Sequence, residues 1–169
     1  MLDFKRDILP LKNIIFRTAL RIVLNREEAE DIVQDTLMKL WQRRDELEQV
    51  KNLEAFALSS ARNLAIDRKE RMENRNVSLD DEAHNCPDES SLGGDSHIVQ
   101  QETHHFITSI INSLPEKQRT ILQLRDIEGK NYKEIANLLS ITESDVKVSL
   151  FRARSELKTR ILQKKSLFL

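Results

Sequence analysis

An acidic stretch in the middle of the chain divides it into two parts that each need a core of their own. From Asn76 to Thr103 there are seven acidic residues, no Lys or Arg, and two of the three glycines of the chain. The apolar residues of this stretch are isolated, so they cannot form a continuous buried face. We interpret residues 77–103 as a flexible acidic linker, with a helix resuming near His97. The chain then consists of an N-terminal domain (1–76) and a C-terminal domain (104–169).

Both domains are predicted to be helical, which makes the fold class all-α. The 169 residues include only three Gly and three Pro, and 33 % of them are charged. This composition favours helices over sheets. Apolar residues recur with a helical period over about 11–24, 26–43 and 53–75. Asn25 and Asn52 stand at the breaks, where capping residues are common.

The C-terminal domain carries helix-start signals that predict a helix-turn-helix. Ser113 is expected to cap a helix with Pro115 in its first turn, and Gly129 is expected to end that helix. Asn131 and Glu134 have the spacing of a capping box before a short helix over about 132–139. Thr142 is expected to start the last helix, which runs to about 162. Two helices joined by about three residues form a helix-turn-helix, whose second helix enters the major groove of DNA.

The last helix has a face suited to reading DNA. At 100° per residue its apolar residues Val146, Leu150 and Ala153 fall on one side and should face the core. The opposite side carries groups that can contact base edges or thymine methyl groups: Ser144, Lys147, Val148, Phe151 and Arg152. Arg154 and Lys158 are placed to reach phosphates. The alternative is an amphipathic helix with a solvated cationic face.

The helix over about 26–43 presents a different kind of surface. Ile32, Val33, Thr36 and Leu40 share one face, whereas Asp31, Gln34, Asp35, Met38 and Trp41 share the other. An exposed Met and Trp among acidic residues are typical of a protein interface. The alternative is that Trp41 packs under the following helix as part of the core.

The C-terminal motifs resemble a known family. Ser113–Arg119, Leu124–Gly129, Tyr132–Ala136 and Val146–Arg154 are similar to the C-terminal domain of extracytoplasmic-function (ECF) sigma factors. The resemblance implies that this domain reads the −35 element of a promoter, with Lys147, Val148, Phe151 and Arg152 against DNA. The chain departs from the family at Ser140, where Gly is usual in the turn, and at Ser149, where Arg is frequent.

The N-terminal motifs resemble the same family. Asp31, Gln34, Asp35, Leu37 and Trp41 match the helix that docks on a coiled coil of the largest polymerase subunit, and Met38 lies on the same face. The next helix is similar to the family's −10 recognition and strand-opening element. Aromatic rings, amides and cations can hold unstacked bases and the DNA backbone, and these groups are Phe56, Arg62, Asn63, Arg68, Lys69 and Arg71.

The resemblance also implies the partners. Core RNA polymerase and promoter DNA are expected, together with an anti-sigma factor. The net charge agrees with a polyanion partner for the C-terminal domain, because residues 104–169 carry 12 basic and 7 acidic residues.

Other features argue against enzymes, metal proteins and membrane proteins. Cys86 is the only cysteine, so no disulfide can form within the chain. The four histidines, His84, His97, His104 and His105, do not form a recognised metal spacing with Cys86. No cofactor motif, signal peptide or membrane span is found, so we expect a cytoplasmic protein that is not an enzyme. The rival hypotheses are a helix-turn-helix regulator without polymerase docking and a helical protein-interaction adaptor.

Overall fold

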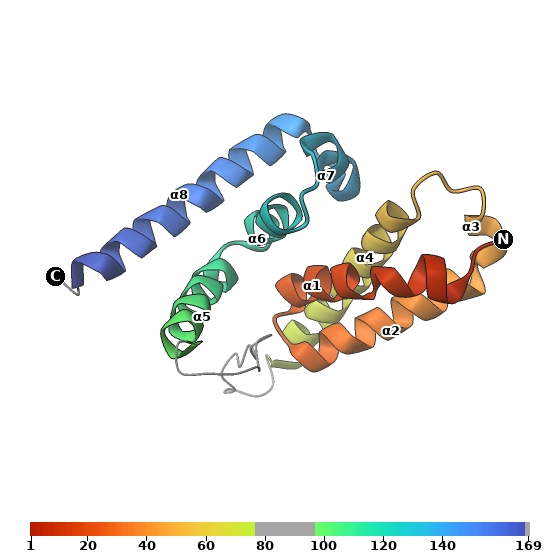
Figure 1. The fold of residues 1–169 in the computed structure, drawn as a ribbon, viewed down its shortest axis with the longest axis horizontal. Helices are drawn as coiled ribbons and strands as arrows, with labels where there is room; N and C mark the ends of the chain where they lie inside the picture. Colours follow the sequence, from red (N-terminus) through yellow and green to blue (C-terminus); the bar gives the residue numbers. More distant parts are fainter. Residues whose placement is uncertain (77–96, 168–169) are drawn as a thin grey trace.

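The N-terminal half is built from helices packed side by side. The computed structural model describes residues 1–76 and 97–167, and every regular element in these ranges is a helix. The N-terminal half begins with a short π-helical turn, η1 (Phe4–Ile8), and a 3₁₀ turn, η2 (Leu9–Leu11). Four α-helices follow: α1 (Lys12–Val23), α2 (Arg26–Gln42), α3 (Arg44–Leu47) and α4 (Leu53–Asn76). In Figure 1 the long helices α1, α2 and α4 lie together on the right.

The C-terminal half contains the expected helix-turn-helix. Its elements are α5 (His97–Ser113), α6 (Glu116–Leu122), the π-helical turn η3 (Gln123–Ile127), α7 (Tyr132–Leu139) and α8 (Glu143–Leu167). Only Ser140, Ile141 and Thr142 separate α7 from α8. The end of α8 extends well away from the N-terminal half (Figure 1). The fold is therefore all-α with two helical domains, as predicted.

Most helix boundaries follow from capping side chains. The Oδ1 atoms of Asn25 and Asn52 accept hydrogen bonds from the backbone N–H groups of Glu28 and Ala55, both at 3.0 Å. Asn131 and Glu134 form the predicted capping box, because each side chain accepts from the other residue's backbone N–H at 2.8 Å. These contacts satisfy N–H groups that have no partner within the first helical turn.

The last helix is capped as predicted but is longer than expected. Thr142 Oγ1 accepts from the N–H of Asp145 at 3.1 Å, which confirms the start of α8. The helix continues to Leu167, beyond the predicted end near residue 162.

Two of the predicted details in the C-terminal half are wrong. Ser113 does not cap a helix start, because it is the last residue of α5 and its hydroxyl donates to the carbonyl of Ile110 at 2.7 Å. The helix after Pro115 also does not run regularly to Gly129, since α6 widens into η3 after Leu122. Gly129 does end this segment, with a φ of +69° that glycine adopts without strain.

The turn of the helix-turn-helix places a serine in a glycine-like conformation. Ser140 has φ 55° and ψ 45°, which is the left-handed region. Leu24, at the end of α1, also has φ 55°. A side chain with a Cβ atom is strained there by about 1–2 kcal/mol. The serine that stands at position 140 in place of the family's usual glycine therefore carries a cost in stability.

The predicted linker is described only at its end. Residues 77–96 lie outside the described residues, and α5 begins at His97, where a helix was expected to resume. Residues 97–103, which the prediction included in the linker, are therefore helical.

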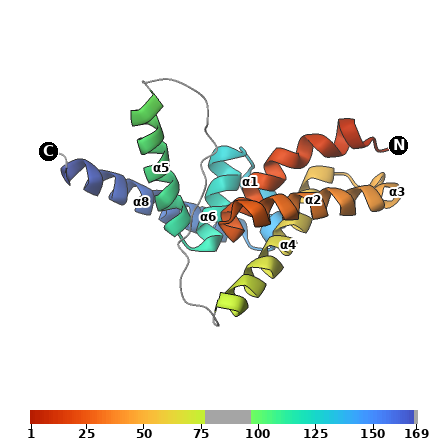
Figure 2. The same cartoon turned by 90° about the horizontal axis from the view of Figure 1, so that it is seen from below.

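The cores of the two halves touch each other. The N-terminal core contains Ile15, Ile22, Ile32 and Leu40, whereas the C-terminal core contains Ile121, Leu124, Ile135 and Val146. Leu58 of α4 is 2 % exposed and belongs to the C-terminal core. Ile14 of α1 also packs against the C-terminal core. Figure 2 shows α1 and α4 against the C-terminal helices from a second direction.

Candidate nucleic-acid and protein interfaces

The first turns of α8 form a surface of exposed apolar and cationic side chains. Val146, Leu150 and Ala153 are buried at 0 %, 2 % and 0 % exposure, as the helical period predicted. Phe151 is 72 % exposed and Val148 is 48 % exposed. The remaining members of the predicted −35 set are all exposed as well: Ser144, Lys147, Arg152, Arg154 and Lys158. This helix therefore presents cations together with an uncovered aromatic ring, and both kinds of group can contact base edges in the major groove.

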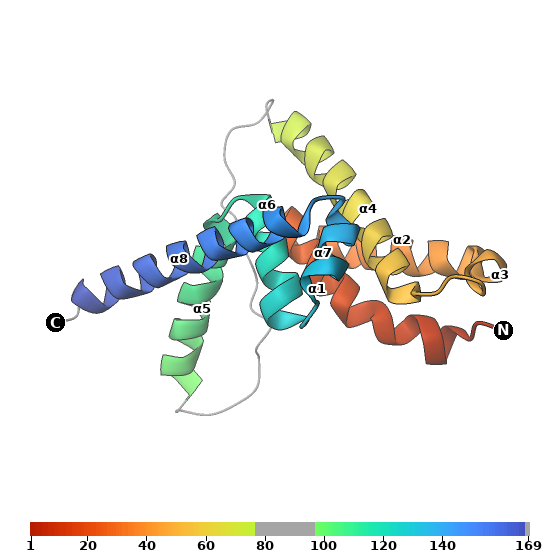
Figure 3. The same cartoon turned by 90° about the horizontal axis from the view of Figure 1, so that it is seen from above.

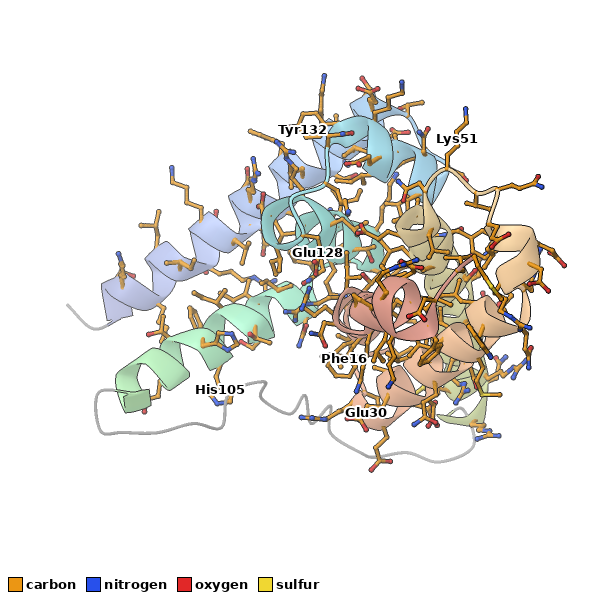
Figure 4. The ribbon with its side chains drawn as sticks, turned by 45° about the vertical axis from the view of Figure 1, so that its right-hand side comes forward. Phe16, Glu30, Lys51, His105, Glu128 and Tyr132 are labelled. Carbon is orange, nitrogen blue, oxygen red and sulfur yellow. The ribbon has the colours of Figure 1, made fainter. Side chains whose placement is uncertain are left out.

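The same surface continues onto the first helix of the motif. Lys147 Nζ lies 5.6 Å from the ring centre of Tyr132, and the guanidinium of Arg125 lies 4.9 Å from the same ring. Tyr132 is labelled in Figure 4, where α7 and α8 meet, and it packs against the C-terminal core. A shallow hollow between α7 and α8 is lined by Tyr132, Lys147, Phe151, Arg154 and Lys158.

Arg154 has a carboxylate partner within the protein. Its guanidinium makes two hydrogen bonds to Asp126 of η3. This hydrogen bonding raises the pKa of Arg154 further above its ordinary value. A phosphate that binds Arg154 must therefore compete with Asp126 or share the guanidinium with it.

Ser149 lies on the buried side of α8, at 9 % exposure. It is flanked by Val148 on the exposed side and by Leu150 in the core. Position 149, where Arg is frequent in the family, therefore lies on the side of α8 that faces away from the proposed DNA surface.

The outer face of α2 exposes the residues that the sequence assigned to a protein interface. Met38 is 58 % exposed and Trp41 is 40 % exposed, so Trp41 is not a core residue. Asp31, Gln34 and Asp35 are also exposed. Leu37 differs, because it is 9 % exposed and belongs to the N-terminal core.

Two neighbours hold the indole of Trp41. The ring of Phe4 in η1 meets it edge to face, with centroids 5.7 Å apart and an interplanar angle of 82°. The guanidinium of Arg44 lies 4.6 Å from the indole centroid, in cation–π geometry. The helical turn η1, which the sequence analysis did not predict, thus becomes part of this surface.

The residues predicted to contact the −10 element lie along α4 in differing environments. Phe56 packs on the N-terminal core and the guanidinium of Arg43 lies 5.5 Å from its ring centre. Asn63 and Arg71 are exposed, whereas Arg62 and Lys69 are half-buried. The end of α4 that carries Lys69 and Arg71 projects beyond the other helices (Figure 3). Arg68 is held by acidic residues of α2.

The two halves are joined by a polar contact between α1 and η3 that the sequence analysis missed. Arg17 donates to Glu128 through Nε at 2.6 Å and through Nη2 at 3.0 Å. The side chain of Glu128 is 6 % exposed, and it also accepts from Gln123 Nε2 at 2.9 Å. Glu128 is labelled in Figure 4, where the C-terminal helices meet α1. We call these side chains the α1–η3 contact.

Further bonds surround the α1–η3 contact. Arg119 is 4 % exposed and donates through Nε to the carbonyl of Arg21 at 2.5 Å. Arg21 donates to Gln123 Oε1 and to Asn112 Oδ1, both at 3.0 Å. Lys130 pairs with Glu54, the second residue of α4. The two halves are therefore joined by charged and polar groups around an apolar patch that includes Leu58.

Within the ranges that the structure describes, no helix is both long and apolar enough to cross a membrane. The same ranges hold no group of three or more His, Cys, Asp and Glu side chains placed to bind a metal ion. His104 and His105 are exposed on α5, and His84 and Cys86 lie outside the described residues.

Comparison with known proteins relates both halves to one class of transcription factor. Residues 8–75 match the family model of sigma-70 region 2, and residues 107–157 match that of sigma-70 region 4. The ECF RNA polymerase sigma factor SigM of Bacillus subtilis is 29 % identical over 148 residues, which are 86 % of this chain and 87 % of that relative. The chain belongs to the ECF sigma factors. The order of the two regions along the chain is the order that the sequence motifs predicted.

Other relatives agree with the family. The "probable RNA polymerase sigma factor RfaY" of Xanthomonas campestris is 28 % identical over 95 % of this chain, and the match spans 41 % of that longer relative. The sigma factor RpoE of Bartonella quintana, solved in complex with the anti-sigma factor NepR, superposes with a TM-score of 0.67 and 25 % identity over 93 % of this chain and 95 % of that one. CnrH, solved with the cytosolic domain of CnrY, shares the fold with a TM-score of 0.63 at 17 % identity.

This sigma factor directs transcription initiation by RNA polymerase, binds core polymerase and promoter DNA, and is not an enzyme. A helix-turn-helix regulator that does not dock on the polymerase would leave the match to region 2 unexplained. A protein-interaction adaptor that binds no DNA would leave the match to region 4 unexplained.

Proposed function

We propose that α8 of this sigma factor reads the −35 element of its promoters. The observation that carries the proposal is the exposure of Phe151 and Val148 between Lys147 and Arg152, on a helix whose other side is buried from Val146 to Ala153. Arg152 is suited to hydrogen-bond a guanine edge, and Phe151 and Val148 are suited to contact thymine methyl groups. Ser144 contributes a hydroxyl, and Arg154 and Lys158 hold phosphates.

The outer face of α2 is the proposed docking surface for core RNA polymerase. Trp41 and Met38 supply apolar area, and Asp31, Gln34 and Asp35 supply polar groups beside it. Trp41 is suited to be an anchor, because a large ring whose position is already held loses little conformational freedom on binding. Leu37 supports this surface from beneath as a core residue.

Helix α4 is the proposed −10 element reader. Phe56 offers a ring on which an unstacked base can stack, Asn63 offers an amide, and Arg62, Arg68, Lys69 and Arg71 offer cations to the strand backbone. The projecting end of α4 gives Lys69 and Arg71 access to a strand that leaves the duplex.

Reading both promoter elements requires the two halves to separate. The −10 and −35 elements lie on the order of 50 Å apart along DNA. We call the arrangement in which the two halves are in contact the closed arrangement. In it Lys130, which lies just before α7, pairs with Glu54 near the start of α4. Arg71 follows Glu54 by 17 positions along α4, a distance of about 26 Å. The two reading surfaces are therefore too close for a straight promoter. We infer that residues 77–96 act as the linker between the two domains, because residues 97–103 belong to α5 and the 20 residues before them can span at most about 70 Å.

An anti-sigma protein is the proposed regulator. Both solved relatives were crystallised with a binding protein of their own, and RpoE is 25 % identical to this chain. A partner that stabilises the closed arrangement would keep the two reading surfaces too close together. We place the protein in the cytoplasm, where core polymerase and chromosomal DNA are found.

Two substitutions separate the proposed surfaces. Arg152→Ala should weaken binding of the −35 element by about 1–3 kcal/mol and leave the affinity for core polymerase unchanged. Trp41→Ala should weaken core binding and leave −35 binding unchanged. Fluorescence anisotropy with labelled promoter duplex and with labelled core polymerase measures both. Unchanged DNA affinity for Arg152→Ala removes that residue from the reading surface, and unchanged core affinity for Trp41→Ala removes α2 from the docking surface.

A further inference from the structure

Arg68 is placed between two surfaces that have separate proposed tasks. It lies on α4 among the residues proposed for the −10 element, but its side chain is directed to α2. Its Nη1 atom lies 2.5 Å from Glu28 Oε2 and 3.8 Å from Asp31 Oδ2, and its Nη2 atom lies 3.6 Å from Asp35 Oδ2. The guanidinium is 29 % exposed, so water screens these attractions only in part.

The three carboxylates form one row along α2. Positions 28, 31 and 35 are spaced at i, i+3 and i+7, which places them on the same face of a helix. The side chains of Asp31 and Asp35 are 61 % and 53 % exposed and belong to the proposed polymerase surface. Glu28 is 27 % exposed and lies outside the residues proposed for docking. Arg68 thus compensates part of the charge of this acidic row, of which Asp31 and Asp35 are proposed to bind core polymerase.

We propose that Arg68 couples polymerase docking to promoter binding. The proposal rests on the docking and −10 surfaces of the proposed function. Cationic groups of the polymerase that bind Asp31 and Asp35 compete with Arg68 for the same carboxylates. Arg68 then keeps only Glu28 as a partner, and a phosphate of a −10 strand bound along α4 can take the place of the two carboxylates that Arg68 has lost. Because such coupling is reciprocal, DNA that takes Arg68 also exposes the acidic row to the polymerase.

A purely structural role for Arg68 makes a different prediction. If the residue only joined α4 to α2, its loss would lower the thermal stability and weaken the binding of polymerase and DNA together. The coupling role predicts changes in opposite directions. Loss of Arg68 would uncover the acidic row for the polymerase and remove a cation from the DNA surface.

The first test uses the full-length free protein and a short labelled single strand that carries the −10 sequence of a promoter defined by transcription. Glu28→Gln removes the closest partner of Arg68 and should raise the affinity for the strand by about 3- to 5-fold, the size of a partly exposed ion pair. Glu27→Gln is the matched control, because Glu27 is exposed in the same helical turn and makes no ion pair with Arg68 among the described residues. The control should change the affinity by less than about 2-fold.

The double variant Glu28→Gln/Arg68→Ala decides whether the gain comes through Arg68. The proposal predicts that the double variant binds the strand no more tightly than the wild type. A gain that persists without Arg68, or an equal gain in Glu27→Gln, would reflect only the change in net charge and would overturn the proposal.

The second test uses the holoenzyme. Arg68→Ala should keep its affinity for core polymerase at or above the wild-type value and should lower promoter opening, measured by permanganate reactivity, by about 10-fold, the size of a lost charged contact. Equal losses in core binding and opening, together with a lower melting temperature, would show a structural role and overturn the coupling. Asp35→Asn tests the docking surface separately: unchanged core binding in that variant refutes docking through α2, whatever the Glu28 variants show.

Discussion

Removing the carboxylate of Glu128 should loosen the closed arrangement of the two halves. Glu128 accepts two hydrogen bonds from Arg17 and one from Gln123, and its side chain is only 6 % exposed. Removing one partner of a fully buried ion pair costs about 3–5 kcal/mol. Arg17 is 34 % exposed, so water can solvate its charge in part after the substitution. We therefore expect Glu128→Ala to cost about 2–3 kcal/mol, a factor of about 30 to 150 in the equilibrium between closed and open forms.

Two measurements on the free protein check this prediction. The melting temperature of Glu128→Ala should fall by about 5–10 °C for a chain of this size, and the radius of gyration from small-angle X-ray scattering should increase. Glu156→Ala is the control, because its ion pair with Arg160 lies within α8, is about 40 % exposed on both sides and should contribute at most about 0.5 kcal/mol. Equal melting temperatures and equal radii for the two variants would refute the assignment of the α1–η3 contact as the attachment between the halves.

The remaining predictions concern local structure. Ser140→Gly should raise the stability by about 1 kcal/mol and the melting temperature by about 2–4 °C, because glycine adopts φ 55° without strain; a lower melting temperature would contradict the strain. The pKa of Asp7 is lowered to about 2 by its hydrogen bonds to Arg6 and to the backbone of Asp3. Because this pKa lies below the unfolded value of about 4, the contribution of Asp7 to η1 is complete above about pH 4 and is lost as the pH falls toward 2. The fluorescence of Trp41, which Phe4 contacts, should change over that range, and a change that persists in Asp7→Asn would assign it to another group.

The helical architecture was predictable because local signals decide it. Asn25, Asn52, Asn131 and Thr142 each stand one position before a helix or a helical turn, and each side chain accepts a backbone N–H. The exposed side of α8 followed from the period of its apolar residues alone. Ser113 failed as a cap because Pro115, with extended backbone (φ −52°, ψ 142°), opens α6 without a side-chain cap. The hydroxyl of Ser113 instead donates to the carbonyl of Ile110 and accepts from Arg160.

The contact between the halves could not be derived in the same way. Arg17 and Glu128 are 111 positions apart, and each looks like a solvated charge within its own helix or turn. Arg119 donates to a carbonyl of the other half, and Leu58 packs into the core of the other half. Leu37 and Arg68 show the same limit on a smaller scale. A family match assigns both to a surface, whereas packing places Leu37 in the core and electrostatics directs Arg68 to α2. Side-chain environments of this kind depend on tertiary structure.

The central claim, that this chain is a promoter-specific initiation factor, is tested most directly by run-off transcription. Core RNA polymerase from the source organism is combined with a genomic promoter library, with and without the protein, and the transcript ends are sequenced. We predict new, defined start sites that share two upstream sequence elements at a constant spacing. DNA binding without new transcripts, while a control sigma factor is active in parallel, would contradict the claim.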